Sequence, residues 1–168
     1  MNLDNIPAGS LCVVDTNVLL YAEQGVSSQA QRLIRRCASG ELKGVLPQTV
    51  WQELTHKLML AEAMMRGLAS GGNPAAKLAA KPDAIRALTL YRAKVQSLLE
   101  LGFGFEPCQL GDLTDRAFGL QEQYGLLAND AMVLAVALRL KANALVSGDK
   151  AFRDIEQPVV YAPTDLRY

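Results

Sequence analysis

Short apolar stretches alternate along this chain with longer segments of helical periodicity. The first stretch, Leu11–Val14, is an unbroken apolar run that ends at Asp15, as in a strand buried on both faces of a parallel sheet. A strand at 158–161 would lie at a sheet edge, because Pro158 cannot donate a hydrogen bond to a neighbouring strand. In all, the pattern predicts strands at 11–14, 44–46, within 102–110, at 144–147 and at 158–161.

The segments between these stretches have the spacing of helices. The segment 28–39 places its apolar residues on one face, whereas the helix that follows Asn129 and Asp130 is apolar nearly all round, as in a helix packed within a fold. Thr49 and Gln52 have the spacing of a capping box and predict a helix from Thr49 to about residue 67. Further helices are expected from Pro82 to about 101 and from Asp112 or Thr114 to about 124. Strands alternating with helices indicate a three-layer α/β/α sandwich with a central parallel sheet of four to five strands.

Length and composition narrow the class of protein. A chain of 168 residues suits one domain, and residues 1–10 are expected to form a loose N-terminal extension to a domain at 11–168. The 17 acidic and 17 basic residues balance, so nucleic-acid binding would depend on a local patch. No apolar run reaches the roughly 20 residues that span a membrane, and no signal peptide is recognisable. Three widely spaced cysteines indicate reduced thiols in a cytoplasmic protein.

Four acidic residues occupy equivalent places in the expected fold. Asp15 and Asp149 each follow a buried strand, Glu53 lies early in the helix after the second strand, and Asp130 opens the helix before the fourth. Right-handed crossovers bring all these places to one rim of the sheet. Each acid has a plainer alternative as a helix cap, a dipole partner or, for Glu53, an ion pair with Lys57. Four clustered carboxylates repel one another without a cation, and hard oxygen ligands indicate Mg²⁺ or Mn²⁺.

These segments resemble, in order and spacing, those of the PIN-domain nucleases, and most closely the VapC-type toxins of bacterial toxin–antitoxin pairs. The resemblance implies a PIN-like domain at 11–168 with a helical insertion at about 61–100, and cleavage of RNA with Mg²⁺ or Mn²⁺. It also implies an antitoxin partner. The matching segments are Val14–Asn17, Gln52–Leu54, Asn129–Ala131 and Ser147–Phe152. The residues that match the family's catalytic and metal-binding acids are Asp15, Glu53, Asp130 and Asp149, with Asn17, Ser147 and Asn129 in supporting places.

The sequence gives weaker signals for binding surfaces than for the acidic site. Lys150 lies nearest the acidic rim and is the first candidate for an RNA contact, followed by Arg35 and Arg36. Any of the three could instead belong to a solvated helix face. A methionine-rich stretch, Met59, Met64, Met65 and Leu68, is typical of an interface and predicts a homodimer.

Two alternative functions remain open. Val13–Asp15 and Gly148–Asp154 resemble the nucleophile strand and metal loop of haloacid-dehalogenase-like phosphatases. That family requires an acid two residues after its nucleophile, where this chain has Asn17, and an amide cannot act as a general acid. The second alternative is a non-catalytic PIN-like module that binds RNA or protein, against which the presence of all four acids argues.

Overall fold

A parallel sheet forms the centre of the structure, a computed structural model that describes residues 1–167. Within these residues the sheet has five strands in the order β3-β2-β1-β4-β5, and every neighbouring pair is parallel. Both the parallel sheet and the edge position of β5 are therefore confirmed. The strands are β1 (Leu11–Val14), β2 (Lys43–Pro47), β3 (Gly104–Glu106), β4 (Ala144–Val146) and β5 (Val159–Tyr161).

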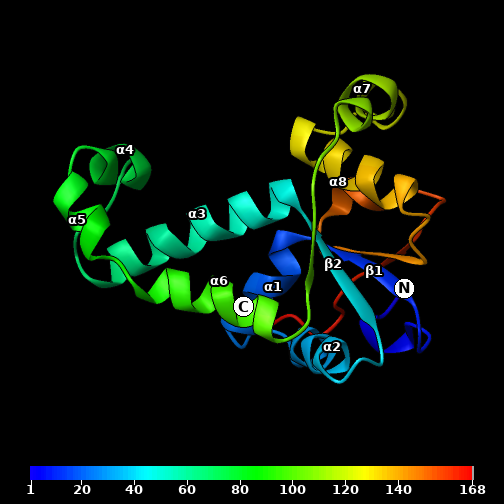
Figure 1. The fold of residues 1–168 in the computed structure, drawn as a ribbon, viewed down its shortest axis with the longest axis horizontal. Helices are drawn as coiled ribbons and strands as arrows, with labels where there is room; N and C mark the ends of the chain where they lie inside the picture. The colour runs from blue at the N-terminus through cyan, green and yellow to red at the C-terminus, as the bar shows by residue number, and fades with distance from the viewer. Residues whose placement is uncertain (168) are drawn as a thin grey trace.

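Helices cover both faces of this sheet, which gives the expected three layers. In Figure 1, α2 lies on one side of the strands and α8 with α7 on the other. Right-handed crossovers account for this division, because the chain leaves β1 toward β2 and β3, and then returns across the sheet to β4. The helices are α1 (Thr16–Glu23), α2 (Ser28–Ala38), α3 (Gln48–Met65), α4 (Pro74–Ala79), α5 (Pro82–Ala87), α6 (Leu90–Glu100), α7 (Phe118–Tyr124) and α8 (Ala128–Arg139).

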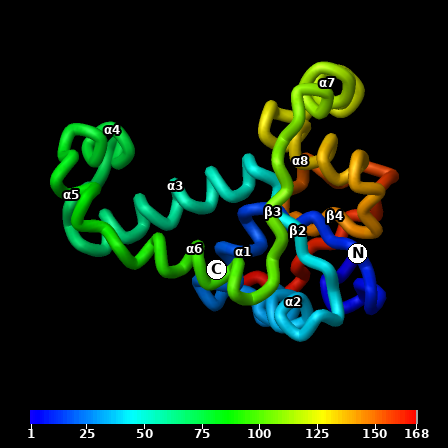
Figure 2. Tube along the Cα trace, in the orientation of Figure 1, coloured from blue at the N-terminus to red at the C-terminus, as the bar shows by residue number. Residues whose placement is uncertain are grey.

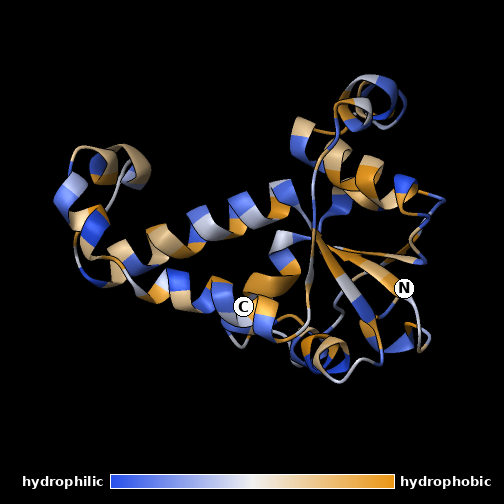
Figure 3. Ribbon diagram, in the orientation of Figure 1, coloured by the Kyte–Doolittle hydropathy of each residue, from blue (hydrophilic) through white to orange (hydrophobic). Residues whose placement is uncertain are grey.

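The central strand and α8 supply the middle of the core. Cys12, Val13 and Val14 of β1 are fully buried, as are Leu134 and its neighbours in α8. Figure 3 shows this concentration of hydrophobic residues along the central strands. Cys12 and Cys37 are free and buried, and Cys108 is free and half-buried. No helix in residues 1–167 is both long and apolar enough to cross a bilayer.

An arm of four helices extends from one end of the sheet. In Figures 1 and 2, α3 and α6 run side by side away from the strands, with α4 and α5 at the tip. A second, smaller core holds the tip together and consists of Ala63, Ala69, Leu78 and Leu88, with half-buried apolar neighbours. The arm contains the segment at about 61–100 that the family resemblance marked as an insertion, together with the first part of α3. Its status as an insertion stays a prediction.

The expected single helix from Pro82 to about 101 is instead two helices. The chain breaks between α5 and α6, where the buried carboxylate of Glu62 accepts hydrogen bonds from the backbone N–H of Thr89 at 3.1 Å and of Tyr91 at 2.9 Å. These donors belong to Thr89, the N-cap of α6, and to its first turn, whose N–H groups have no partner within the helix. A side chain from α3 therefore fixes the start of α6.

The N-terminal segment is packed, so the expectation of a loose extension is wrong. Leu3 and Ile6 are only 1% and 2% exposed, and Asn2 pairs with Ala162 beside β5. Arg36 of α2 donates to the carbonyl oxygens of Leu3 at 3.4 Å and Ile6 at 2.6 Å. Two buried apolar side chains thus anchor a segment that looks polar overall.

Two expected helix caps are also wrong. Helix α3 begins at Gln48 directly after Pro47, and the Thr49 hydroxyl finds no hydrogen-bond partner among the described residues. Asp112 is not a cap but opens a π-helical turn, η2 (Asp112–Ala117), where it is fully buried and accepts from Arg139 Nε at 2.8 Å. Thr49 therefore lies inside α3 and not at its start, and at Asp112 a tertiary ion pair replaces the local motif.

Candidate active site

A polar pocket of about 360 Å³ opens at the rim where β1 and β4 end. The four acids that the sequence places on this rim all line it. They come from four different parts of the chain: the end of β1, the second turn of α3, the first turn of α8 and the loop after β4. The lining residues are Asp15, Thr16, Asn17, Tyr21, Glu53, Lys57, Asp130, Gly148, Asp149 and Lys150.

Asp15 is the most deeply placed of the acids, with 7% of its surface exposed. Its Oδ1 accepts from the Thr16 N–H at 2.6 Å. Its Oδ2 accepts from Ser147 Oγ at 2.7 Å and from Asn17 Nδ2 at 2.6 Å. Burial raises the pKa of Asp15, and the hydrogen bonds from Ser147 and Thr16 oppose that rise. Asp15 therefore both caps α1 and presents a carboxylate held from three sides.

Asn17 and Ser147 join the ends of β1 and β4 around this carboxylate. Asn17 Nδ2 lies 3.1 Å from Ser147 Oγ, and Asn17 Oδ1 accepts from the Gly148 N–H at 2.8 Å. Ser147 Oγ in turn accepts from the Asp149 N–H at 3.0 Å. The loop that carries Asp149 is thereby fixed relative to Asp15.

Gly148 permits the close approach of that loop to α1. A Cβ at this position would lie 2.8 Å from Cε2 of Tyr21, too close for any larger residue without movement. Asp149 follows, and its Oδ1 accepts from the Ala151 N–H at 2.8 Å at the start of the turn η3 (Lys150–Phe152). Asp149 thus also caps the turn η3, the role that the sequence offered as an alternative to a place in a metal site.

Both oxygens of Glu53 have partners. Oε1 lies 2.7 Å from Lys57 Nζ, the ion pair that the i,i+4 spacing offers. Oε2 accepts from Thr16 Oγ1 at 3.0 Å. Thr16 links Glu53 to the strand that carries Asp15, a connection that sequence reasoning missed because a threonine after an aspartate has the pattern of an ordinary helix start.

Asp130 shows the electrostatic effect of the convergence. Its pKa is raised to about 6, first by burial and then by the negative charges of Asp149, Asp15 and Glu53, with Lys57 acting in the opposite direction. The charges of the other three carboxylates therefore act directly on Asp130, because all four side chains lie close together.

The donor set fits a hard divalent cation in its chemistry. Every acidic group that lines the pocket offers carboxylate oxygens, the ligands that Mg²⁺ and Mn²⁺ prefer. Within residues 1–167, no group of three or more acidic, histidine or cysteine side chains already has the arrangement needed to hold a metal ion. Ligation through Oε1 of Glu53 would require the cation to displace Lys57.

The candidate RNA contacts separate into two groups. Lys150 lines the acid pocket, next to Asp149 in the turn η3. Asn129 lines an adjoining hollow together with Glu53, Asp130 and Asp149. These residues are where the sequence places them.

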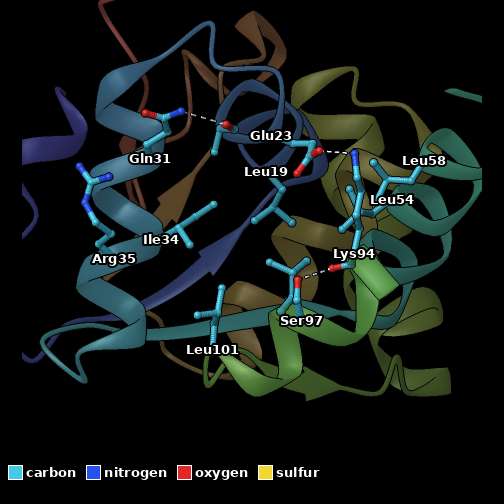
Figure 4. A pocket seen from close by; sticks show the side chains of 12 residues that line it. Leu19, Glu23, Gln31, Ile34, Arg35, Leu54, Leu58, Lys94, Ser97 and Leu101 are labelled. Atoms are coloured by element: carbon cyan, nitrogen blue, oxygen red, sulfur yellow. Dashed lines mark hydrogen bonds and ion pairs between the residues drawn. The ribbon is translucent and has the colours of Figure 1, made fainter. Parts of the chain in front are cut away.

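Arg35 and Arg36 are not brought to the acid pocket. Arg36 pairs with Glu41 at 2.7 Å and holds the N-terminal segment. Arg35 lines a different pocket, of about 410 Å³, between α1, α2, α3 and α6. Figure 4 shows that pocket, with Leu19, Ile34 and Leu54 directed into it and the Glu23–Lys94 ion pair at its side.

Comparisons with known proteins agree with this architecture. Two solved structures cover almost the whole chain. One is a toxin–antitoxin complex from Klebsiella pneumoniae, with a TM-score of 0.60 and 18% identity over 92% of this chain and 99% of the matched one. The other is the VapBC2 complex from Rickettsia felis bound to a promoter DNA fragment, with a TM-score of 0.56 and 15% identity over 91% and 98% of the two chains. At these identities the likeness concerns the fold.

No curated protein matches the chain. The family model described as PIN domain matches residues 12–158, which include β2, β3, β4, all of β1 but its first residue, and all four acids of the pocket. The five-stranded parallel sheet, the acids at its rim and this match together lead to one conclusion: the chain belongs to the PIN-domain family.

Proposed function

We propose that this protein is an Mg²⁺- or Mn²⁺-dependent endoribonuclease and the toxin of a toxin–antitoxin pair. The observation that carries the enzymatic part is the pocket in which Asp15, Glu53, Asp130 and Asp149 meet. Four carboxylates from distant parts of a chain, one with a pKa raised by burial and by the charges of the other three, are typical of a functional site. The fold shared with chains of two toxin–antitoxin complexes supports the toxin part.

The acids would hold the cation, and the remaining pocket residues would hold the acids and the substrate. A bound Mg²⁺ or Mn²⁺ supplies Lewis acidity to the phosphodiester and to water. Ser147 and Asn17 keep the Oδ2 of Asp15 in place through hydrogen bonds of 2.7 and 2.6 Å. Lys150 would bind a phosphate at the mouth of the pocket. In-line attack by water on phosphorus would break the bond to the 3′-oxygen, leaving a 5′-phosphate and a 3′-hydroxyl.

Asn17 also bears on the phosphatase alternative. Its amide donates to the Asp15 carboxylate, which in a phosphatase would have to attack phosphorus. No acid stands at that position to protonate a leaving group, so the site favours phosphodiester hydrolysis by water.

A cleavage assay with end mapping tests this function. Purified protein should cut RNA in Mn²⁺ or Mg²⁺, leave 5′-phosphates and stop when EDTA is added. Asp130→Asn should lower the rate at least 100-fold, since removal of a single transition-state-stabilising group has effects of about this size. Asp83→Asn, at an exposed arm position, is the matched control. Rapid hydrolysis of a small phosphomonoester without RNA cleavage would instead support the phosphatase.

The antitoxin is the protein partner that we propose. The pocket of Figure 4 combines an apolar floor, including Leu19 and Leu54, with a charged and polar border of Arg35, Gln31 and Lys94. Such a surface suits a short amphipathic segment of another chain. The product of a small reading frame adjacent to the gene should co-purify with the protein and inhibit cleavage. Ile34→Asp should weaken that complex and leave cleavage by the free protein intact.

A further inference from the structure

Lys57 places a positive charge inside the acid pocket. It lies one helical turn after Glu53 in α3, and its ammonium nitrogen is 2.7 Å from Glu53 Oε1. It lines the same pocket as Asp15, Asp130 and Asp149, and its charge opposes the rise in the pKa of Asp130. The pocket thus contains its own counter-ion.

This ion pair has a consequence for cation binding. A divalent cation among the acids would meet a like charge at short range, and like charges a few ångströms apart repel appreciably even in water. Oε1 of Glu53 is held by Lys57, and Oε2 accepts a hydrogen bond from the Thr16 hydroxyl. A cation that binds Glu53 through Oε1, alone or together with Oε2, therefore has to displace Lys57.

The lysine side chain can make such a move. Its side chain is 46% exposed, and its ammonium group sits on a flexible four-carbon stem that presents donors in any direction. Once detached from Glu53 it would remain at the mouth of the pocket, where a phosphate of a bound strand is the complementary charge.

We propose that Lys57 alternates between two partners: Glu53 in the metal-free protein, and a substrate phosphate once a divalent cation has taken Glu53. The phosphate half of this inference rests on the proposed nuclease function. The cation half requires only that the acids bind Mn²⁺. Lys57 is then a substrate-binding residue that also keeps the empty acid cluster partly neutralised.

A second ion pair offers a matched control. Arg32 pairs with Asp4 at 2.7 Å, with exposures of 44% and 39% for the two side chains. The Arg32→Gln variant removes the same charge from a similar exposed pair, and neither partner lines the acid pocket.

The first measurement is the affinity for Mn²⁺ alone, by titration calorimetry. Lys57→Gln should bind Mn²⁺ about 5- to 10-fold more tightly than wild type, because a competing charge has left the site. Lys57→Arg, which keeps the charge, should resemble wild type, and so should Arg32→Gln. Circular dichroism melts in EDTA check that each variant is folded.

The second measurement is the KM for RNA at saturating Mn²⁺ and several salt concentrations. Lys57→Gln should raise KM about 3- to 10-fold, and its salt dependence on a logarithmic plot should be shallower by about 0.7, the contribution of one contact to a single strand. Lys57→Arg should restore both values. Tighter Mn²⁺ binding and weaker RNA binding from one substitution is a combination that a simple surface ion pair does not produce.

The outcomes separate this inference from the proposed function. If wild type binds Mn²⁺ and cuts RNA but Lys57→Gln differs in only one of the two measurements or in neither, the alternation is wrong and the nuclease stands. If wild type neither binds Mn²⁺ nor cuts RNA, the proposed function and this inference both fail.

Discussion

The carboxyl groups of Asp15 and Asp130 face one pocket from different surroundings. Asp15 is buried and accepts from Thr16, Ser147 and Asn17, whereas Asp130 is half-buried and its pKa is raised by burial and by the neighbouring charges. Substitution by asparagine should therefore have opposite effects on stability at the two positions.

Asp15→Asn should destabilise the metal-free protein. An asparagine offers one acceptor oxygen and turns an NH₂ group toward donors, so at least one buried hydrogen bond to a charged group is lost, at a cost of about 1–3 kcal/mol. Urea unfolding in EDTA measures the difference in the free energy of unfolding. An Asp15→Asn variant as stable as wild type would mean that the hydrogen bonds around this carboxylate contribute little.

Asp130→Asn should remove a pH dependence of stability. The carboxyl pKa of Asp130 in the folded protein, about 6, exceeds its ordinary value of 3.8, so the folded state holds this proton more tightly than the unfolded state. The contribution of Asp130 to stability is complete below pH 3.8 and is lost as the pH rises through 6. In EDTA, the melting temperature of Asp130→Asn relative to wild type should rise between pH 4 and 7 and then level off. A constant difference across that range would contradict the assigned environment.

At the residue scale, the sequence predicted which acids meet at the rim, but not the hydrogen bonds and close contacts that fix their side chains. Their positions after strands and at helix starts suffice for the rim, because topology places those points together. The hydrogen bonds from Ser147 and Asn17 to Asp15, and the close approach of Gly148 to Tyr21, depend on the distance between β1 and β4. The hydrophobic periodicity of the sequence gives no information about that distance.

At the scale of single elements, local signals predicted well wherever packing agreed with them. All five strands and the apolar helix α8 follow from their patterns. The capping box at Thr49 failed because α3 begins at Gln48, one residue earlier, so that Thr49 lies inside the helix. The single helix after Pro82 failed because the tertiary hydrogen bonds of Glu62 divide it.

Glu62→Gln should loosen the arm without disturbing the acid pocket. Burial alone would raise the pKa of Glu62, but hydrogen bonds from the backbone N–H groups of Tyr91, Thr89 and Leu90, with the charge of Arg66, hold it below its usual value. The charged form thus stabilises the start of α6, and that stabilisation is lost only as the pH falls through the lowered pKa.

Hydrogen exchange measures this effect at neutral pH. In Glu62→Gln, amides of α5 and α6 should exchange several-fold faster while those of β1 and β4 keep their protection, since the arm has its own small core. Asp83→Asn, which removes an exposed carboxylate from the same arm, should leave exchange unchanged. Uniformly faster exchange throughout the protein would show that the arm and the sheet open as one unit.

At the scale of the whole molecule, we propose a homodimer. Met64 and Met65 are exposed as expected, but Met59 and Leu68 pack against the small core of the arm. A broader apolar surface lies where α3, α6 and β3 meet, and there Leu99 is 52% and Phe105 54% exposed beside Trp51 and Val95. A surface of this kind is more often an interface than a face left in water.

Light scattering tests this association directly. Wild type should have twice the chain mass of 18.2 kDa at micromolar concentration, and a Leu99→Arg, Phe105→Arg double variant should have the mass of one chain. Met64→Gln, in the exposed stretch nearer the arm tip, serves as the control. A wild-type mass of one chain at high concentration would exclude the dimer.

The central claim is that the four carboxylates at the rim form a cation site, and its most direct test is the melting temperature with and without Mn²⁺. A cation that binds only the folded state stabilises it by mass action, by about 2.7 kcal/mol at a concentration 100 times the dissociation constant. Wild type should therefore melt several degrees higher in saturating Mn²⁺ than in EDTA, and Asp130→Asn and Asp149→Asn should gain much less, whereas Asp83→Asn should gain as much as wild type. A wild-type melting temperature that is the same in Mn²⁺ and in EDTA would contradict the assignment of the site.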